Sequence, residues 1–105
     1  MEENTGLVTI KRTSPQDLKM RDLYVRVDDL PEDTMLYGDS LEIPLTPGDH
    51  QIKITNRLYT KSADFQVKAG ESVRFSVANV ESKGILNFVM TMTGSFSYKV
   101  RLERI

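Results

Sequence analysis

Apolar and polar residues alternate with a period of two along most of the chain. In residues 23–28 (LYVRVD), Leu23, Val25 and Val27 share one face, and the polar side chains and Tyr24 share the other. Such alternation is typical of a β-strand with one buried and one wet face. The same pattern predicts seven strands, over residues 6–12, 23–28, 41–45, 50–55, 63–67, 73–77 and 96–102.

Turn-forming residues separate these strands, as at Pro47-Gly48 and Ala69-Gly70. Short alternating strands at this spacing predict an all-β fold, an antiparallel β-sandwich of seven to eight strands in a single domain, residues 1–105. Pro44 cannot donate a ladder hydrogen bond, so we expect residues 41–45 at a sheet edge. The inward positions predict the core: Val8, Ile10, Leu23, Val25, Val27, Leu41, Ile43, Ile52, Ile54, Phe65, Val67, Val73, Phe75, Val77, Tyr98, Val100 and Leu102.

One segment, residues 84–94 (GILNFVMTMTG), departs from the alternation because it is apolar at nearly every position. As a strand it places four large side chains on one face. One interpretation is core, an eighth strand between the sheets, because apolar runs are mostly buried. The other is a surface for a homodimer or a protein partner that adds a strand. The side chains of that candidate surface are Leu86, Phe88, Met90 and Met92.

Composition narrows the classes of function. The 105 residues contain no cysteine, which excludes disulfides and zinc–thiolate sites. The formal net charge is −1 with both signs interspersed, so the sequence predicts no nucleic-acid partner. No stretch has the length of a membrane helix or the apolar region of a signal peptide, so we expect any targeting segment to lie outside this chain. The compartment stays open.

Candidate chemistry is sparse. His50 is the only histidine, and at the start of a strand its ring is expected to pack inward while a nitrogen meets a turn carbonyl. Asp28, Asp29, Glu32 and Asp33 cluster in one loop, which is typical of a solvated turn and lacks the EF-hand spacing for calcium. No catalytic set and no metal or cofactor site is predicted.

Three tyrosines fall outside the inward pattern or in loops: Tyr24, Tyr37 and Tyr59. Exposed aromatic rings beside polar loops stack on sugars or anchor protein interfaces, and they also pack against long Lys or Arg stems. These tyrosines are therefore the candidate ligand-stacking residues, with carbohydrate as the ligand class.

Residues 6–80 resemble the PEGA domain family. The clearest motif is residues 45–54 (LTPGDHQIKI), similar to the family's proline-glycine turn, histidine and alternating strand. The other matches are residues 6–8 (GLV), Ser14-Pro15, residues 25–28 (VRVD), Tyr59 and residues 67–71 (VKAGE). The Pro-Glu-Gly-Ala motif is absent, residues 16–22 are extra, and residues 81–105 lie outside the resemblance as additional C-terminal strands.

The resemblance implies an Ig-like or prealbumin-like sandwich, and a more distant transthyretin-like or carboxypeptidase-regulatory-like sandwich is the alternative. It implies no catalytic residues. It suggests a bacterial protein, in the envelope or outside the cell if a targeting segment has been removed. The expected function is a non-enzymatic interaction or spacer module, and the alternative is a carbohydrate-binding module that uses the exposed tyrosines.

Overall fold

The computed structural model describes residues 4–19, 21–81 and 98–105, which form eight strands in two four-stranded sheets. The first sheet has the order β4–β1–β7–β8 and the second has the order β3–β2–β5–β6. The strands are β1 (Gly6–Lys11), β2 (Leu23–Val27), β3 (Asp33–Met35), β4 (Ser40–Leu45), β5 (Gly48–Thr55), β6 (Thr60–Val67), β7 (Ser72–Glu81) and β8 (Tyr98–Arg104).

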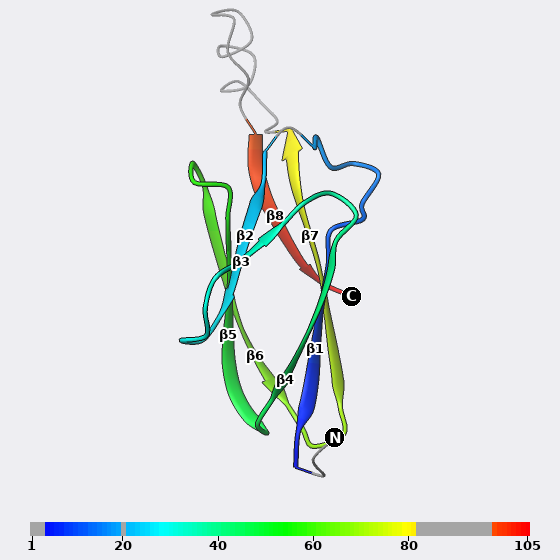
Figure 1. The fold of residues 1–105 in the computed structure, drawn as a ribbon, viewed down its shortest axis with the longest axis vertical. Helices are drawn as coiled ribbons and strands as arrows, with labels where there is room; N and C mark the ends of the chain where they lie inside the picture. The colour runs from blue at the N-terminus through cyan, green and yellow to red at the C-terminus, as the bar shows by residue number, and fades with distance from the viewer. Residues whose placement is uncertain (1–3, 20, 82–97) are drawn as a thin grey trace, which may run out of the picture.

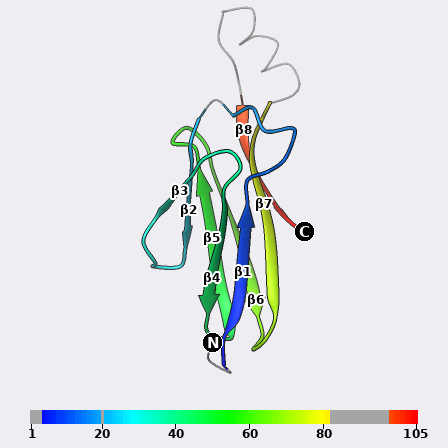
Figure 2. The same cartoon turned by 45° about the vertical axis from the view of Figure 1, so that its right-hand side comes forward.

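The two sheets form two layers, seen side by side in Figure 1 and again after the rotation in Figure 2. Their inward apolar side chains make one buried cluster, as alternation requires. The all-β prediction is confirmed, and most of the predicted core is buried. Leu41, Ile43 and Leu102 are only partly buried, and the side chain of Tyr98 lies outside the described residues.

The strand β3 and its core residue Met35 were not expected from the sequence. Met35 is fully buried and lies opposite Leu23 in the antiparallel pair of β3 with β2. A strand of three residues with one inward apolar side chain is too short to show a period, which is why the pattern missed it. The expected edge position of residues 41–45 is confirmed, since β4 borders only β1.

One strand pair contradicts the prediction of an antiparallel fold. β1 lies between β4 and β7, and its pairing with β7 is parallel, with Ile10 opposite Phe75. Alternation places the same side chains inward whichever way a strand runs, so it carries no information about direction. Strands far apart in the sequence are also free of the hairpin constraint that makes neighbours antiparallel.

The start of β1 packs tightly against the turn between β6 and β7. A Cβ at Gly6 would lie 2.3 Å from a methyl carbon of Val67 and 2.7 Å from the carbonyl oxygen of Lys68. The turn is fixed at this point because Leu7 N–H donates to the Glu71 carbonyl. Backbone atoms have little room to yield, so this position requires glycine.

We therefore expect Gly6→Ala to lower the free energy of unfolding by about 1–3 kcal/mol, the usual cost of overpacking. The exposed Lys11→Ala on the same strand is the control, with an expected change within about 0.5 kcal/mol. Urea unfolding of both variants measures the difference. Equal losses would show that the turn moves away from β1 at little cost.

Candidate interaction surfaces

Polar side chains close one end of the space between the sheets. Arg12, Asn56 and Asn79 follow the inward positions of β1, β5 and β7, and each is exposed by 1% or less. Here the inward pattern continues, but apolar residues give way to polar ones. Buried polar groups are costly unless they are hydrogen-bonded, so their partners decide whether this end is stable.

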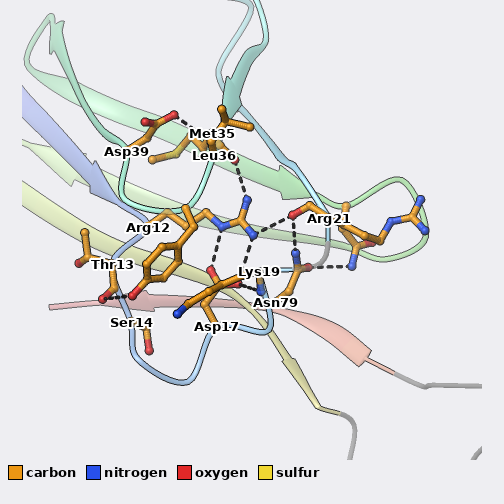
Figure 3. Close-up of polar contacts among 12 residues, drawn as sticks. Arg12, Thr13, Ser14, Asp17, Lys19, Arg21, Met35, Leu36, Asp39 and Asn79 are labelled. Atoms are coloured by element: carbon orange, nitrogen blue, oxygen red, sulfur yellow. Dashed lines mark hydrogen bonds and ion pairs between the residues drawn. The ribbon is translucent and has the colours of Figure 1, made fainter.

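Each of the three side-chain nitrogens of Arg12 donates at least one hydrogen bond (Figure 3). Its Nε and Nη2 donate to the two carboxylate oxygens of Asp17 at 2.8 and 3.1 Å, a fork that suits the planar guanidinium. Its Nη1 donates to the Met35 carbonyl and its Nη2 to the Arg21 carbonyl, both at 2.7 Å. Asp17 is itself buried and also accepts the N–H of Lys19. One side chain thus fixes the β1–β2 connection and the end of β3.

The two asparagines extend this network to the turn between β5 and β6. Asn79 Nδ2 donates to the same Arg21 carbonyl, and its Oδ1 accepts from Asn56 Nδ2 at 3.0 Å. The side-chain oxygen of Asn56 accepts the backbone N–H groups of Leu58 and Tyr59. The β3–β4 loop and the β5–β6 turn are therefore joined at their bases through buried hydrogen bonds.

These two loops carry exposed apolar side chains at one end of the molecule. Tyr24 of β2 pairs with Thr34 and with Thr55, so the chain beyond β3 and the chain beyond β5 both continue past the same end of β2. Figures 1 and 2 show both loops there. We call this surface the loop end. Its four large exposed side chains are Leu36 (53% exposed), Tyr37, Leu58 (60% exposed) and Tyr59.

The three predicted stacking tyrosines do not share one open platform. Tyr24 lies on the outer face of the second sheet, with the Arg57 guanidinium 3.9 Å from its ring centre. Tyr37 lies on the loop end, with Lys19 Nζ 4.4 Å from its ring centre. Tyr59 is exposed in the β5–β6 turn. A sugar stacking on Tyr24 or Tyr37 has one ring face to use, because a cation covers the other.

A second polar cluster lies at the opposite end of β2. Asp28, with a φ of 50°, turns its carboxylate to His50, whose Nδ1 is 2.5 Å from Asp28 Oδ2. His50 Nε2 is 2.6 Å from the Thr46 carbonyl, and its ring lies 5.8 Å from that of Phe65. The expected inward packing of His50 against a turn carbonyl is confirmed.

Carboxylate and carbonyl oxygens only accept, so both contacts of His50 are complete only when its ring is protonated. Burial disfavours the charged ring, but the hydrogen bonds to Asp28 and Thr46 and the nearby negative charges outweigh it and raise the pKa of His50 above 6.5. Burial likewise opposes the Asp28 carboxylate. The hydrogen bonds from His50 and from the Gln51 N–H prevail and lower the pKa of Asp28 below 3.8.

The remaining candidate residues are those of the apolar segment, residues 84–94. Leu86, Phe88, Met90 and Met92 lie outside the described residues. In the part of the chain that the structure describes, no three His, Cys, Asp or Glu side chains are grouped to hold a metal ion. Nor does a helix long and apolar enough to cross a membrane occur there.

Comparisons with protein-family models, with curated proteins and with solved structures each found no match. The resemblance to the PEGA family therefore stays a prediction from the motifs quoted above.

The sequence contains one signal for the buried network, which lies in the continuation of the strand pattern. Continuing the inward alternation of three strands by one or two steps reaches Arg12, Asn56 and Asn79. Asparagine is common in turns, and arginine is rarely buried, so residue type alone assigns all three to the surface. The partner Asp17 lies in a connection with no period at all.

We expect Arg12→Met to lower the free energy of unfolding by about 3–5 kcal/mol, because it leaves the Asp17 carboxylate buried without its cation. The control is Arg57→Ala, which breaks the exposed ion pair with Glu32 and should lower the free energy of unfolding far less than Arg12→Met does. Combining Arg12→Met with Asp17→Leu should cost less than the sum of the two single changes. Urea unfolding gives all four values, and additivity would contradict a coupled pair.

The pair of His50 and Asp28 should make stability depend on pH. The raised pKa of His50 stabilises the fold below the unfolded value of 6.5, and this contribution is lost as pH rises through the folded value. The lowered pKa of Asp28 stabilises it above 3.8, and this contribution is lost as pH falls through the folded value. The contribution of the pair is thus complete between these two values.

The excess stability of the wild type over His50→Gln should therefore shrink as pH rises from about 5.5 to about 9. Urea unfolding at a series of pH values measures it. A difference that is constant over this range would mean that His50 does not gain its proton on folding.

Proposed function

We propose that this chain is a non-catalytic interaction module that presents its loop end to a protein partner. One observation carries the proposal. Leu36, Tyr37, Leu58 and Tyr59 are exposed at one end, on two loops whose bases are joined by the buried network of Arg12, Asn56 and Asn79.

The energetics favour a binding surface here. Ordering flexible loops on association costs free energy, and loops already fixed at their bases avoid part of that cost. The Asn56 side chain holds the backbone of Leu58 and Tyr59, so these anchors are positioned before a partner arrives. Leucine and tyrosine beside the cations Lys19 and Arg57 fit the apolar centre and polar rim of a protein interface.

The contacts of His50 support a non-catalytic role. Both ring nitrogens are occupied, one by the Asp28 carboxylate and one by the Thr46 carbonyl, so neither faces a hydroxyl nucleophile. A half-buried histidine with both ring nitrogens paired acts as a structural tie between two turns.

We infer further that the two sheets form an Ig-like or prealbumin-like sandwich. Loops at one end of such a sandwich are a common place for recognition. The PEGA-like motifs favour a bacterial, multidomain setting, in which a module of this kind binds or spaces other domains. This step rests on analogy of fold and motif.

Site-specific photo-crosslinking in the producing cells tests the proposed partner surface. A photoreactive benzoylphenylalanine replaces Leu58, and in a matched control it replaces Leu30, which is also exposed but lies beyond the far end of β2. We expect a discrete cross-linked protein from position 58 and none from position 30. Purified with this chain, that protein should bind Leu58→Asp about tenfold or more weakly than wild type.

Two results would overturn the loop end as the interface. One is cross-linking from position 30 that equals or exceeds that from position 58. The other is an affinity for the cross-linked protein that Leu58→Asp leaves unchanged while unfolding experiments show the variant folded.

A further inference from the structure

The outer face of β2, β5 and β6 separates its charges along the strands. Toward the loop end, Arg26 lies directly opposite Lys53 in the register of β2 with β5, and Arg57 stacks on Tyr24 beside them. These groups line a depression of about 260 Å³, whose carboxylate is Glu32, paired with Arg57. We call this the basic half.

The other half of the same face is acidic. Asp49 and Asp64 point outward from β5 and β6, and Asp28 follows β2. Their outward neighbours are amides: Gln51 Nε2 donates to Asp64 and Gln66 Nε2 donates to Asp49. A wider depression of about 870 Å³ is lined by these side chains, by His50 and Phe65, and by Arg104 of β8 in the other sheet. We call this the acidic half.

This separation is unfavourable within one chain. Like charges directly opposite each other destabilise a strand pair, whereas opposite charges stabilise it. Among the contacts of the described residues, neither Arg26 nor Lys53 has an ion pair or a side-chain hydrogen bond. Exchanging one cation with one carboxylate across β5 would remove the conflict, so the arrangement needs an explanation outside the single chain.

We propose that this face is self-complementary and binds a second copy of the chain. A two-fold axis that runs across the strands between the halves reverses their direction in the partner. It brings the basic half of each copy over the acidic half of the other. Every interaction then occurs twice, as in any isologous interface.

Spacing along β5 suits this pairing. Lys53 and Gln51 point to the same side of β5 and are two residues apart, about 7 Å at the usual strand rise, and Gln51 lies opposite Asp64 and beside Asp28. An axis at the level of Ile52 places the row of Arg26 and Lys53 of each copy over the row of Asp28, Gln51 and Asp64 of the other. The face is small, roughly 14 Å across and at most about 26 Å long for three strands of five to eight residues, well under the 800 Å² per partner of a standard interface. The dimer is therefore weak and depends on protein concentration and salt.

The reversed orientation sends the two loop ends in opposite directions. If the loop end binds a partner as proposed above, the dimer links two partner molecules. The self-association itself does not depend on that proposal.

Sedimentation equilibrium of the full chain, up to high protein concentration, tests the proposal with three proteins. The acidic variant carries Arg26→Glu and Lys53→Glu, and the basic variant carries Asp49→Lys and Asp64→Lys. The wild type should approach twice the mass of one chain at low ionic strength and return to one chain at high ionic strength. Each variant alone should stay monomeric, because like charges then face each other.

A mixture of equal amounts of the two variants is the decisive sample. One face then carries an excess of carboxylates and the other an excess of cations, so the mixture should form a heterodimer that high salt dissociates. Leu58→Asp should leave the wild-type dimer intact, which separates this face from the loop end. Circular dichroism confirms that each variant is folded.

Three results would overturn the self-complementary face. They are a wild type that is monomeric at every concentration and salt, charge variants that associate like the wild type, and a mixture that shows no heterodimer.

Discussion

The buried ion pair of Arg12 with Asp17 is the contact on which the loop end of the two-layer fold depends. Two sheets can bury apolar side chains between them only while the strands last, and beyond that point connections must cross the gap. Their carbonyl groups then lie where water is excluded. Arg12 resolves this at a single position, because its guanidinium donates four hydrogen bonds, two to Asp17 and two to carbonyls from different connections.

Such an ion pair does more to fix one arrangement of the connections than to raise the free energy of unfolding. A buried ion pair gains little over an apolar replacement of both partners, but leaving one charge unpaired is costly. A placement of residues 12–19 or of the end of β3 that breaks a contact of the network leaves a buried polar group unpaired. The alternatives are thus penalised, and the loops that carry Leu36 and Leu58 inherit a defined geometry.

The sequence predicted the strands and most of the core because both follow from the alternation of apolar and polar residues that are neighbours in the sequence. It failed where contacts join distant positions. Arg21 and Asn79 are 58 residues apart, and no local pattern links them. The direction of β1 beside β7 was missed for the same reason, whereas β3 was missed because three residues are too few to show a period. The tyrosines were found, but their covering cations were not, since Lys19 and Arg57 depend on turns with φ of 61° and 74°.

The same alternation explains why the outer face informs about function. Outward side chains of β2, β5 and β6 contribute nothing to the core, so folding constrains them little beyond β propensity and solubility. Selection for stability pairs opposite charges across neighbouring strands. Here the Arg26–Lys53 row does the reverse, while inside the fold the described polar groups of the network find partners. In the self-complementary face that we propose, the carboxylates of a second copy supply the missing counter-charges of this row.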